Sequence, residues 1–381
     1  MVLSTKARNG NGANIRVRSG EYASFIYVRM NSFVRLLLRI LTAVVFAGMG
    51  LVLICLAVLE FAFAVPNLSV SSSWSFFSSE PKFLVIGDWG REGEYNQSVV
   101  AEAMAQKASR FNPDFVISTG DNFYEWGLTS PSDEAFDVSF RNVYNQSELQ
   151  VPWHAVLGNH DYGEVDDPGK GPKNCPKHEE ECYYSPIHQL DPRLIDRDSR
   201  WHCERSFKLS LVDGNVDIFF IDTTPILTKY EEKSWAVNKG GVLQQSWEEQ
   251  VKELDGKLHR STAKIKILVG HHPIRTNHQD DFQFDDMVDT IEPLIVKHKV
   301  ALYMCGHDHN LQHIHVSELG YHQVISGAGS KIGTGFHGSK DSPFQYDKNG
   351  FAAVTIKRNK IHVEYIGVDN DEPLFEISIP V

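Results

Sequence analysis

Lys82-Phe-Leu-Val-Ile-Gly-Asp-Trp-Gly-Arg91 is the stretch of sequence that decides the fold. Its apolar run leads directly into Gly87 and Asp88, as expected for a strand that is buried on both faces and ends in a polar turn. Four later segments repeat this order of apolar run, glycine and polar side chain. They are Phe115–Gly120 before Asp121, Ala155–Gly158 before Asn159, Ile267–Gly270 before His271, and Leu302–Gly306 before His307.

Segments with helical spacing of apolar residues alternate with these strands. The spacing of Val99, Val100, Ala103, Met104 and Phe111 predicts a helix over 98–111. Further helices are predicted over 246–258, with Ser246 as the N-cap, and over 285–297. Strands are expected at 114–119, 264–269 and 299–305, and a hairpin at 351–366. This alternation predicts an α/β protein with sheets covered by helices.

The polar residues at the strand ends are the types that bind metal ions. In open α/β sheets, ligands bind beyond the carboxyl ends of the strands, so these side chains are expected to converge. Each residue alone has an ordinary explanation, such as a turn aspartate or a core histidine. Five motifs in this order, each at a strand end, predict a site for two metal ions. Its expected ligands are Asp88, Asp121, Tyr124, Asn159, His271, His307 and His309.

These motifs resemble the metallophosphoesterases and, more narrowly, the purple acid phosphatases, also called tartrate-resistant acid phosphatases. The resemblance covers about residues 81–367 and includes Gly-Asp-Trp-Gly-Arg, Gly-Asp-Asn-Phe-Tyr, Gly-Asn-His and Gly-His-Asp-His. General metallophosphoesterases have a histidine where Gly90 stands here, and Tyr124 supplies a different ligand. The resemblance implies a four-layer αββα sandwich of two mixed β-sheets flanked by helices.

The resemblance also implies how the ligands divide between the ions. Two anionic oxygens and a phenolate suit Fe(III), whereas imidazoles and an amide oxygen suit a divalent ion such as Fe, Zn or Mn. Asp121 is expected to bridge the two ions. The ferric ion would be bound by Asp88, Tyr124 and His309, and the divalent ion by Asn159, His271 and His307.

The implied activity is that of an acid phosphatase that hydrolyses phosphate monoesters by attack of a metal-bound hydroxide at an Fe(III)–M(II) centre. His160 would hold the phosphate or protonate the leaving group. His278 is either the acid for the leaving group or a solvated loop residue. Two alternatives stay open: a metallophosphodiesterase or nucleotide pyrophosphatase of the same fold, or a redox or metal-binding protein with weak hydrolysis.

Five further side chains near the motifs receive supporting or structural roles. His272 is expected next to the metal ligands without binding metal, and Asp161 and Asp308 are expected to be hydrogen-bond partners of the site. His313 and His315 are interpreted as structural.

The N-terminal part of the chain has a different character. Residues 1–39 are basic, 40–64 are expected to form a signal peptide or a signal-anchor helix, and 65–80 a Ser-rich linker before the catalytic domain, 81–381. We therefore expect a secreted or lumenal protein, extracellular or vacuolar, with a type II membrane anchor as the alternative. Asn67, Asn96 and Asn145 begin glycosylation sequons, which agrees with this expectation.

Composition limits the partners that can be expected. Residues 40–381 hold 30 basic and 48 acidic residues, so nucleic acid is not an expected partner. Small phosphomonoesters are the expected substrates, and a monomer is the expected state. Of the five cysteines, Cys175 and Cys182 could close a polar loop by a disulfide, with the pairing left open, and Cys305 is expected to be a buried thiol.

Overall fold

A computed structural model describes residues 80–163, 183–278, 284–333, 335–336, 342–370 and 372–381. The predictions for the basic segment, the apolar segment and the linker, together with Cys175 and Cys182, lie outside these residues. Within the described part of the chain, no helix has the length and apolar character needed to cross a bilayer. Cys203 and Cys305 are buried free thiols, which confirms the prediction for Cys305.

Seven strands form the first sheet, in the order β14-β13-β12-β1-β2-β3-β4. The four strands from β1 to β4 are parallel, while β12, β13 and β14 are antiparallel to their neighbours. The predicted hairpin is formed by β12 and β13. The bounds are β1 Lys82–Ile86, β2 Phe115–Ser118, β3 Trp153–Ala155, β4 Trp201–Cys203, β12 Gly350–Lys357, β13 Lys360–Gly367 and β14 Phe375–Pro380.

The second sheet also has seven strands, in the order β11-β9-β10-β8-β7-β6-β5. Its centre, from β6 through β7 and β8 to β10, is parallel, and β5, β9 and β11 are antiparallel to their neighbours. The bounds are β5 Ser206–Leu211, β6 Val216–Ile221, β7 Ile265–Val269, β8 Leu302–Cys305, β9 Leu311–Val316, β10 Tyr321–Ser326 and β11 Phe344–Tyr346.

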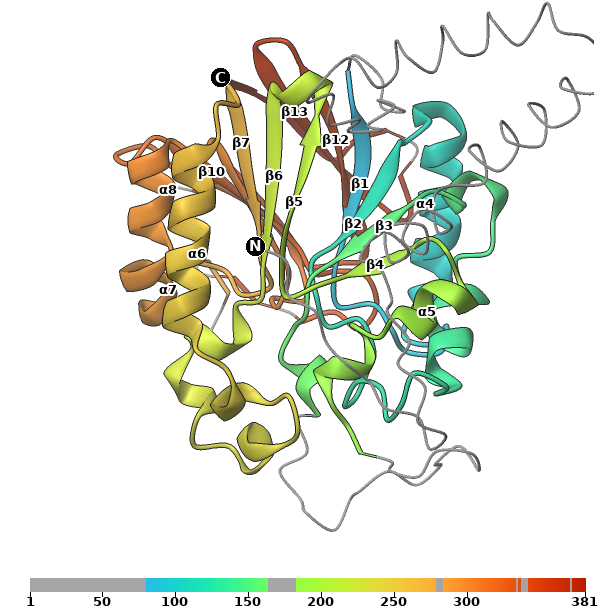
Figure 1. Cartoon of the computed structure of the whole chain (residues 1–381). Helices are drawn as coiled ribbons and strands as arrows, with labels where there is room; N and C mark the ends of the chain where they lie inside the picture. Colours follow the sequence, from blue (N-terminus) through green and yellow to red (C-terminus); the bar gives the residue numbers. More distant parts are fainter. Residues whose placement is uncertain (1–79, 164–182, 279–283, 334, 337–341, 371) are drawn as a thin grey trace, which may run out of the picture. The chain divides into compact units, whose positions relative to one another are not determined.

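Helices cover the outer faces of both sheets, so the chain forms the predicted αββα sandwich of two mixed sheets. Figure 1 shows α6, α7 and α8 beside the second sheet and α4 and α5 beside the first. The bounds are α4 Gln97–Phe111, α5 Pro192–Arg197, α6 Trp247–Arg260, α7 Asp285–Thr290 and α8 Glu292–His298. As predicted, Ser246 is the N-cap of α6, and its side chain accepts a hydrogen bond from the backbone N–H of Glu249.

Alternation along β1 explains why this strand is apolar on both faces. Phe83 and Val85 belong to the apolar layer between the two sheets, whereas Leu84 and Ile86 pack toward the helix layer. All four side chains are fully buried. A central strand of this sandwich therefore reads as a continuous apolar run.

Two details of the helix predictions are wrong. The helix predicted over 285–297 is divided at Ile291, and α8 begins with Pro293 in its first turn. Proline lacks the N–H that would continue the preceding helix, but it suits the start of a new one. In α4, Val99 is 48 % exposed, so the apolar side chains of the buried helix face begin at Val100.

Candidate metal centre

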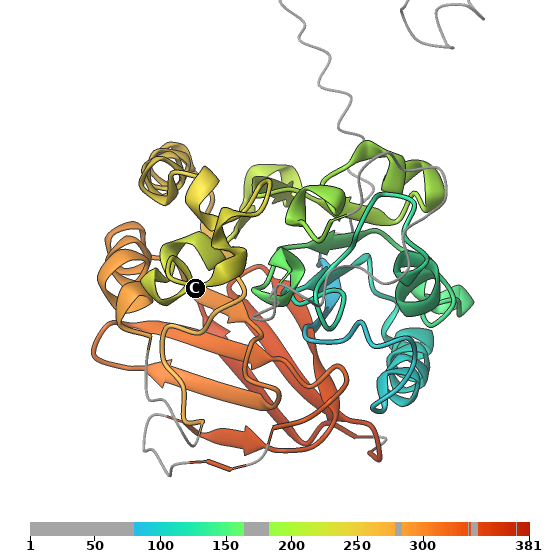
Figure 2. The same ribbon diagram turned by 90° about the horizontal axis from the view of Figure 1, so that it is seen from below.

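The seven predicted ligands converge at one end of the sandwich. Asp88, Asp121 and Asn159 follow strands β1, β2 and β3 of the first sheet, while His271 and His307 follow β7 and β8 of the second. The site therefore lies across the two sheets. The short turns of residues 224–244 lie beyond the lower ends of the strands in Figure 1, and Figure 2 views the molecule from below.

Four of these residues meet at the phenol oxygen of Tyr124. Tyr124 Oη lies 2.9 Å from Asp121 Oδ2, 3.1 Å from Asp88 Oδ1 and 2.9 Å from His309 Nε2. His309 Nε2 is also 3.4 Å from Asp88 Oδ1. We call Asp88, Asp121, Tyr124 and His309 the tyrosine cluster.

The other three residues meet at the amide oxygen of Asn159. Asn159 Oδ1 lies 3.0 Å from His307 Nδ1 and 3.2 Å from His271 Nε2, and these two nitrogens are 3.3 Å apart. We call Asn159, His271 and His307 the asparagine cluster. Asp121 connects the two clusters, because its Oδ1 is 3.5 Å from His271 Nε2 while its Oδ2 faces Tyr124.

The donor set fits a pair of metal ions. His271 Nδ1 lies 2.8 Å from the carbonyl oxygen of Thr119 and must donate to it, which leaves Nε2 with a lone pair in the neutral ring. That lone pair faces the acceptor oxygens of Asn159 and Asp121. Hydrogen-bond acceptors that face one another at this distance need a proton or a cation between them. The Thr119 carbonyl also holds the His271 ring in the orientation that a metal ligand requires.

Electrostatics also favour positive charge at this place. Burial alone would lower the pKa of His271, but the Asp121 and Asp88 carboxylates raise it to about 9. Burial works against the charge of Asp121, yet His271 and His160 hold the pKa of that carboxyl well below its ordinary value. Burial and both carboxylates raise the pKa of the Tyr124 phenol, so its ionisation requires a nearby cation.

Three of the seven residues have a backbone conformation that is uncommon for residues other than glycine. The φ angles of Asp88, Asp121 and His307 are 60°, 51° and 69°. Each such residue costs about 1–3 kcal/mol, and such conformations persist where the surrounding structure holds them in place. The strand-end loops therefore hold these three side chains toward the site in a strained backbone conformation, as is common at functional sites.

Two of the strand-end glycines are required for different reasons. Gly120 has a φ of +97°, a conformation that glycine adopts without a steric penalty. At Gly158, a Cβ atom would lie 2.2 Å from Asp121 Oδ1. The glycine before Asn159 is therefore needed because the Asp121 carboxylate approaches the backbone closely.

Asp161 supports the loops that carry Asp121 and Asn159. It is fully buried, and its carboxylate accepts hydrogen bonds from the backbone N–H groups of Asn122, Phe123 and Gly158 at 2.9–3.1 Å. Gln189 Nε2 donates a further bond at 2.7 Å. Burial and the charge of Asp121 raise the pKa of Asp161 to about 7. The predicted supporting role of Asp161 agrees with this geometry.

His272 and Asp308 also contact the site from outside. His272 Nδ1 lies 2.9 Å from Thr223 Oγ1 and its Nε2 lies 3.0 Å from the hydroxyl of Tyr230, so both ring nitrogens are occupied. Its nitrogens could reach an ion shared with His271 and His307, but these contacts make it a supporting residue. Asp308 accepts a hydrogen bond from the Thr276 hydroxyl.

The two predicted catalytic histidines occupy different positions. The backbone N–H of His160 donates to Asp121 Oδ1 at 2.9 Å, and its ring lies 4.5 Å from the ring of Tyr124. His160 is therefore at the edge of the tyrosine cluster. His278 lies further out, where it pairs with Phe336 in an isolated bridge, and its backbone N–H donates to Thr276 Oγ1.

Sequence reasoning missed two cations beside the site. The Arg91 guanidinium carbon lies 3.6 Å from the ring centroid of Tyr124. Lys229 Nζ lies 4.7 Å from the Phe284 ring, which in turn contacts the ring of His307 at 5.4 Å. Arg91 stands in the first motif, but nothing in the spacing indicates that it reaches over Tyr124.

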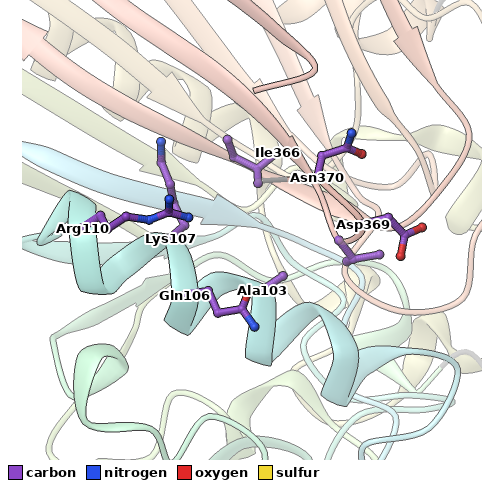
Figure 3. A pocket seen from close by; sticks show the side chains of 8 residues that line it. Ala103, Gln106, Lys107, Arg110, Ile366, Asp369 and Asn370 are labelled. Atoms are coloured by element: carbon purple, nitrogen blue, oxygen red, sulfur yellow. The ribbon is translucent and has the colours of Figure 1, made fainter. Parts of the chain in front are cut away.

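Two hollows lie away from the ligands. A pocket of about 180 Å³ lies between α4 and the end of β13. Figure 3 shows side chains that line it, among them Lys107, Ile366 and Asp369. Lys107 also pairs with Glu364 at 2.9 Å. A groove of about 510 Å³ is lined by residues at the starts of β6 and β7 and at the turn between β12 and β13, among them Lys264, Lys357 and Arg358. Neither hollow is lined by any of the seven converging residues.

The fold and the two clusters define a metallophosphoesterase. The family model of the calcineurin-like phosphoesterases matches residues 81–311. Among curated proteins, the chain is 36 % identical to purple acid phosphatase 4 of Arabidopsis thaliana over 334 residues, which is 84 % of this chain and 90 % of that protein. It is 39 % identical to purple acid phosphatase 3 of the same plant over 297 residues, or 75 % and 74 % of the two chains.

A solved structure shares the fold. It is the purple acid phosphatase PPD1 from seeds of yellow lupin, Lupinus luteus, with a TM-score of 0.55 and 16 % identity over 80 % of this chain and 54 % of that one. The chain belongs to the purple acid phosphatases. It is accordingly an acid phosphatase of the metallophosphoesterase superfamily, and this family uses a binuclear metal centre.

Proposed function

We propose that this protein hydrolyses phosphate monoesters at an Fe(III)–M(II) centre, with Fe, Zn or Mn as the divalent ion. The observation that carries the proposal is the convergence of Asp88, Asp121 and His309 on the oxygen of Tyr124. A phenol ligand with two carboxylates suits a hard trivalent ion. In this proposal the tyrosine cluster holds the iron.

The asparagine cluster would hold the divalent ion. Its own donors are one amide oxygen and two imidazole nitrogens, and only the shared Asp121 carries formal negative charge. Neutral nitrogen donors suit divalent Zn, Fe or Mn. The proposed ligand set of the iron is thus more negative than that of the divalent ion, because it includes the Asp88 carboxylate and the Tyr124 phenolate.

Two such ions supply a clamp for the phosphoryl oxygens and lower the pKa of water. The chain's own residues would orient the substrate. The imidazole of His160 has its Nδ1 2.7 Å from the carbonyl oxygen of Glu125, which fixes the ring beside Tyr124. From this position His160 would hold a phosphoryl oxygen or deliver a proton to the leaving oxygen.

His278 is the less direct candidate for leaving-group chemistry. It lies beside the segment that follows the ligand loops, because a Cβ atom on Gly333 would be 3.5 Å from His278 Nε2 and 3.7 Å from the Cβ of His309. A larger leaving group that extends past His309 would meet His278.

We further propose a monomer in a secreted or lumenal compartment, with small phosphomonoesters as substrates and no nucleic acid. Asn96 and Asn145 are both exposed on the catalytic domain, as glycosylation requires. Treatment of the purified protein with an endoglycosidase should reduce its apparent mass. The absence of such a shift would contradict entry into the secretory pathway.

The metal assignment is tested by purification followed by metal analysis and a visible spectrum. The expected protein is coloured, contains iron and a second metal, and hydrolyses an aryl phosphate at acid pH. A colourless protein without iron would contradict the role of Tyr124. Faster hydrolysis of a bis-aryl phosphate than of the aryl phosphate would favour a diesterase.

A further inference from the structure

Arg91 is a buried cation placed against a proposed metal ligand. Its side chain is 5 % exposed, and its guanidinium carbon is 3.6 Å from the ring centroid of Tyr124. The ring of Tyr95 lies 5.4 Å away. Arg91 Nη1 pairs with the carboxylate of Glu125, while its Nε is buried and makes no hydrogen bond. The ring of Tyr124 is therefore one of the main groups in contact with the buried Arg91 guanidinium.

The backbone around Arg91 is fixed independently of the ring contact. The N–H of Arg91 donates to Gln97 Oε1 at 2.9 Å, and the Gln97 amide donates to the carbonyl of Ser139 at 2.7 Å. The N–H of Tyr124 donates to the carbonyl of Gly90 at 2.8 Å. The two motif loops are thus joined one residue before Arg91, which holds the guanidinium over the ring.

A cation over an aromatic face is attracted by the negative charge of the π-system. The attraction increases when the phenol becomes a phenolate, because the ring then carries a full negative charge. Arginine suits this place better than lysine, since its planar group can stack on the ring and still pair with a carboxylate. Arg91 therefore interacts more strongly with the ionised, metal-binding form of Tyr124 than with the neutral phenol.

We propose that Arg91 is a positioning residue that orients Tyr124 and sets the electronic properties of its phenolate, and hence the colour and reduction potential of the bound iron. The inference rests on the proposed function, because it requires iron on Tyr124. The guanidinium lies over the ring, closer to the electron donor than to an ion at Oη. Arg91 therefore stabilises the ring electrons and raises the energy of charge transfer from phenolate to iron.

The same charge acts on the oxidation state of the iron. A nearby positive charge favours the state with less positive charge, so Arg91 raises the potential at which the ferric ion is reduced. Glu125 opposes both effects. Its side chain is 53 % exposed, so solvent screens it more than the buried arginine. Removal of Arg91 and removal of the Glu125 charge should shift the two properties in opposite directions.

The test compares the absorption maximum and the midpoint potential of iron-loaded variants at equal iron content. Arg91→Met should move the maximum to longer wavelength and lower the potential. Arg91→Lys should give a smaller shift, because the charge stays but the planar contact is lost. Glu125→Gln should move the maximum to shorter wavelength and raise the potential. Lys107→Met removes a cation that pairs with Glu364 between α4 and β13, away from the seven converging residues, and should change neither property.

An unchanged maximum in coloured Arg91→Met would overturn the inference and leave the iron assignment standing. If Arg91→Met does not fold or bind iron, Glu125→Gln decides: a shift to shorter wavelength supports the inference, and no shift overturns it. A wild-type protein without iron would overturn the proposed function together with this inference.

Discussion

Two groups of histidines in this protein differ in whether carboxylates lie beside their imidazole rings. His271 and His307 belong to the asparagine cluster, whereas His313, His315 and His322 form a second group on strands β9 and β10. In that second group the rings of His315 and His322 stack at 4.0 Å, and His313 Nε2 lies 3.0 Å from His322 Nδ1. Both groups are dense in imidazoles, but only the first has carboxylates beside it.

The pKa of each imidazole depends on the charges beside it. Burial and the charges of His271 and Lys229 hold the pKa of His307 well below its ordinary value, although His307 belongs to the asparagine cluster. Burial and the neighbouring imidazoles lower the pKa of His313 to about 3 and that of His322 to about 4. His271 is buried as well, but Asp121 and Asp88 raise its pKa to about 9. Neighbouring acceptors, rather than the number of histidines, therefore decide whether a buried imidazole group attracts a cation. The structural role predicted for His313 and His315 agrees with this view.

Replacement of Asp121 should have the largest effect, because it removes the carboxylate that both clusters share. In Asp121→Ala the imidazoles of the asparagine cluster would resemble those on β9 and β10. Loss of a supporting partner costs about 10–100-fold in metal affinity or activity, so loss of the bridge should reduce activity by more than ~100-fold. Metal analysis and hydrolysis of an aryl phosphate measure both effects.

The control for this variant is Asp217→Ala. Asp217 is a buried carboxylate on β6 that accepts hydrogen bonds from Ser210 and Ser261. It is not among the converging residues, so its variant should keep its metals. Full activity in Asp121→Ala would refute the bridging role.

Two single variants should separate the clusters. Tyr124→Phe removes the oxygen on which the tyrosine cluster converges, and we expect loss of iron and of colour with retention of the divalent ion. Asn159→Ala should show the reverse, a coloured protein that lacks the divalent ion. Each should lower activity by about 100-fold, at the upper end of the range for groups around a metal. Metal content per chain is the measurement.

The outcome that contradicts this division is equal loss of both metals in both variants. The two clusters would then form one cooperative site rather than two separable ones. Such a result would leave the convergence of the seven residues intact but remove the assignment of one ion to each cluster.

The strands and the positions of the polar residues at their ends were predictable because they depend on local patterns. Apolar runs such as Phe83–Ile86 need two covered faces, and a ligand that directly follows each run must lie at the sheet end. The period of apolar residues also located α4 and α6. The break at Ile291 was missed because the apolar spacing continues across it, although Pro293 suits the start of a new helix rather than the interior of one.

Contacts between distant loops were not predictable in the same way. Arg91 over Tyr124 and Lys229 over Phe284 depend on where long side chains lie after folding. The positive φ of Asp88 is likewise imposed by tertiary packing and contradicts the preference of the residue itself. Sequence periodicity carries no information on either kind of feature.

Replacement of Asp161 should weaken the site without removing a ligand. Asp161→Ala leaves the backbone N–H groups of Asn122, Phe123 and Gly158 without their acceptor, which loosens the loops of Asp121 and Asn159. We expect metal affinity to fall by about 10-fold, measured by competition with a chelator. Unchanged affinity would show that these loops keep their geometry without the carboxylate.

The smallest effect concerns the histidines on β9 and β10. The folded-state pKa of His313, about 3, lies below its unfolded value of about 6.5, so below pH 6.5 the unfolded chain binds a proton that the folded chain excludes. Folding stability is therefore unaffected above pH 6.5 and falls as the pH decreases from 6.5 toward 3. His313→Phe removes this penalty.

Between pH 7 and about pH 5.5, His313→Phe should lose about 1 kcal/mol less stability than the wild-type protein. Denaturant unfolding at the two pH values measures the difference, and His259→Gln, at an exposed position on α6, is the matched control. An identical pH dependence in His313→Phe and wild type would mean that the imidazole is protonated in the folded protein. The histidines on β9 and β10 would then carry positive charge without neighbouring carboxylates. Carboxylates would therefore not be what distinguishes them from the histidines of the metal centre.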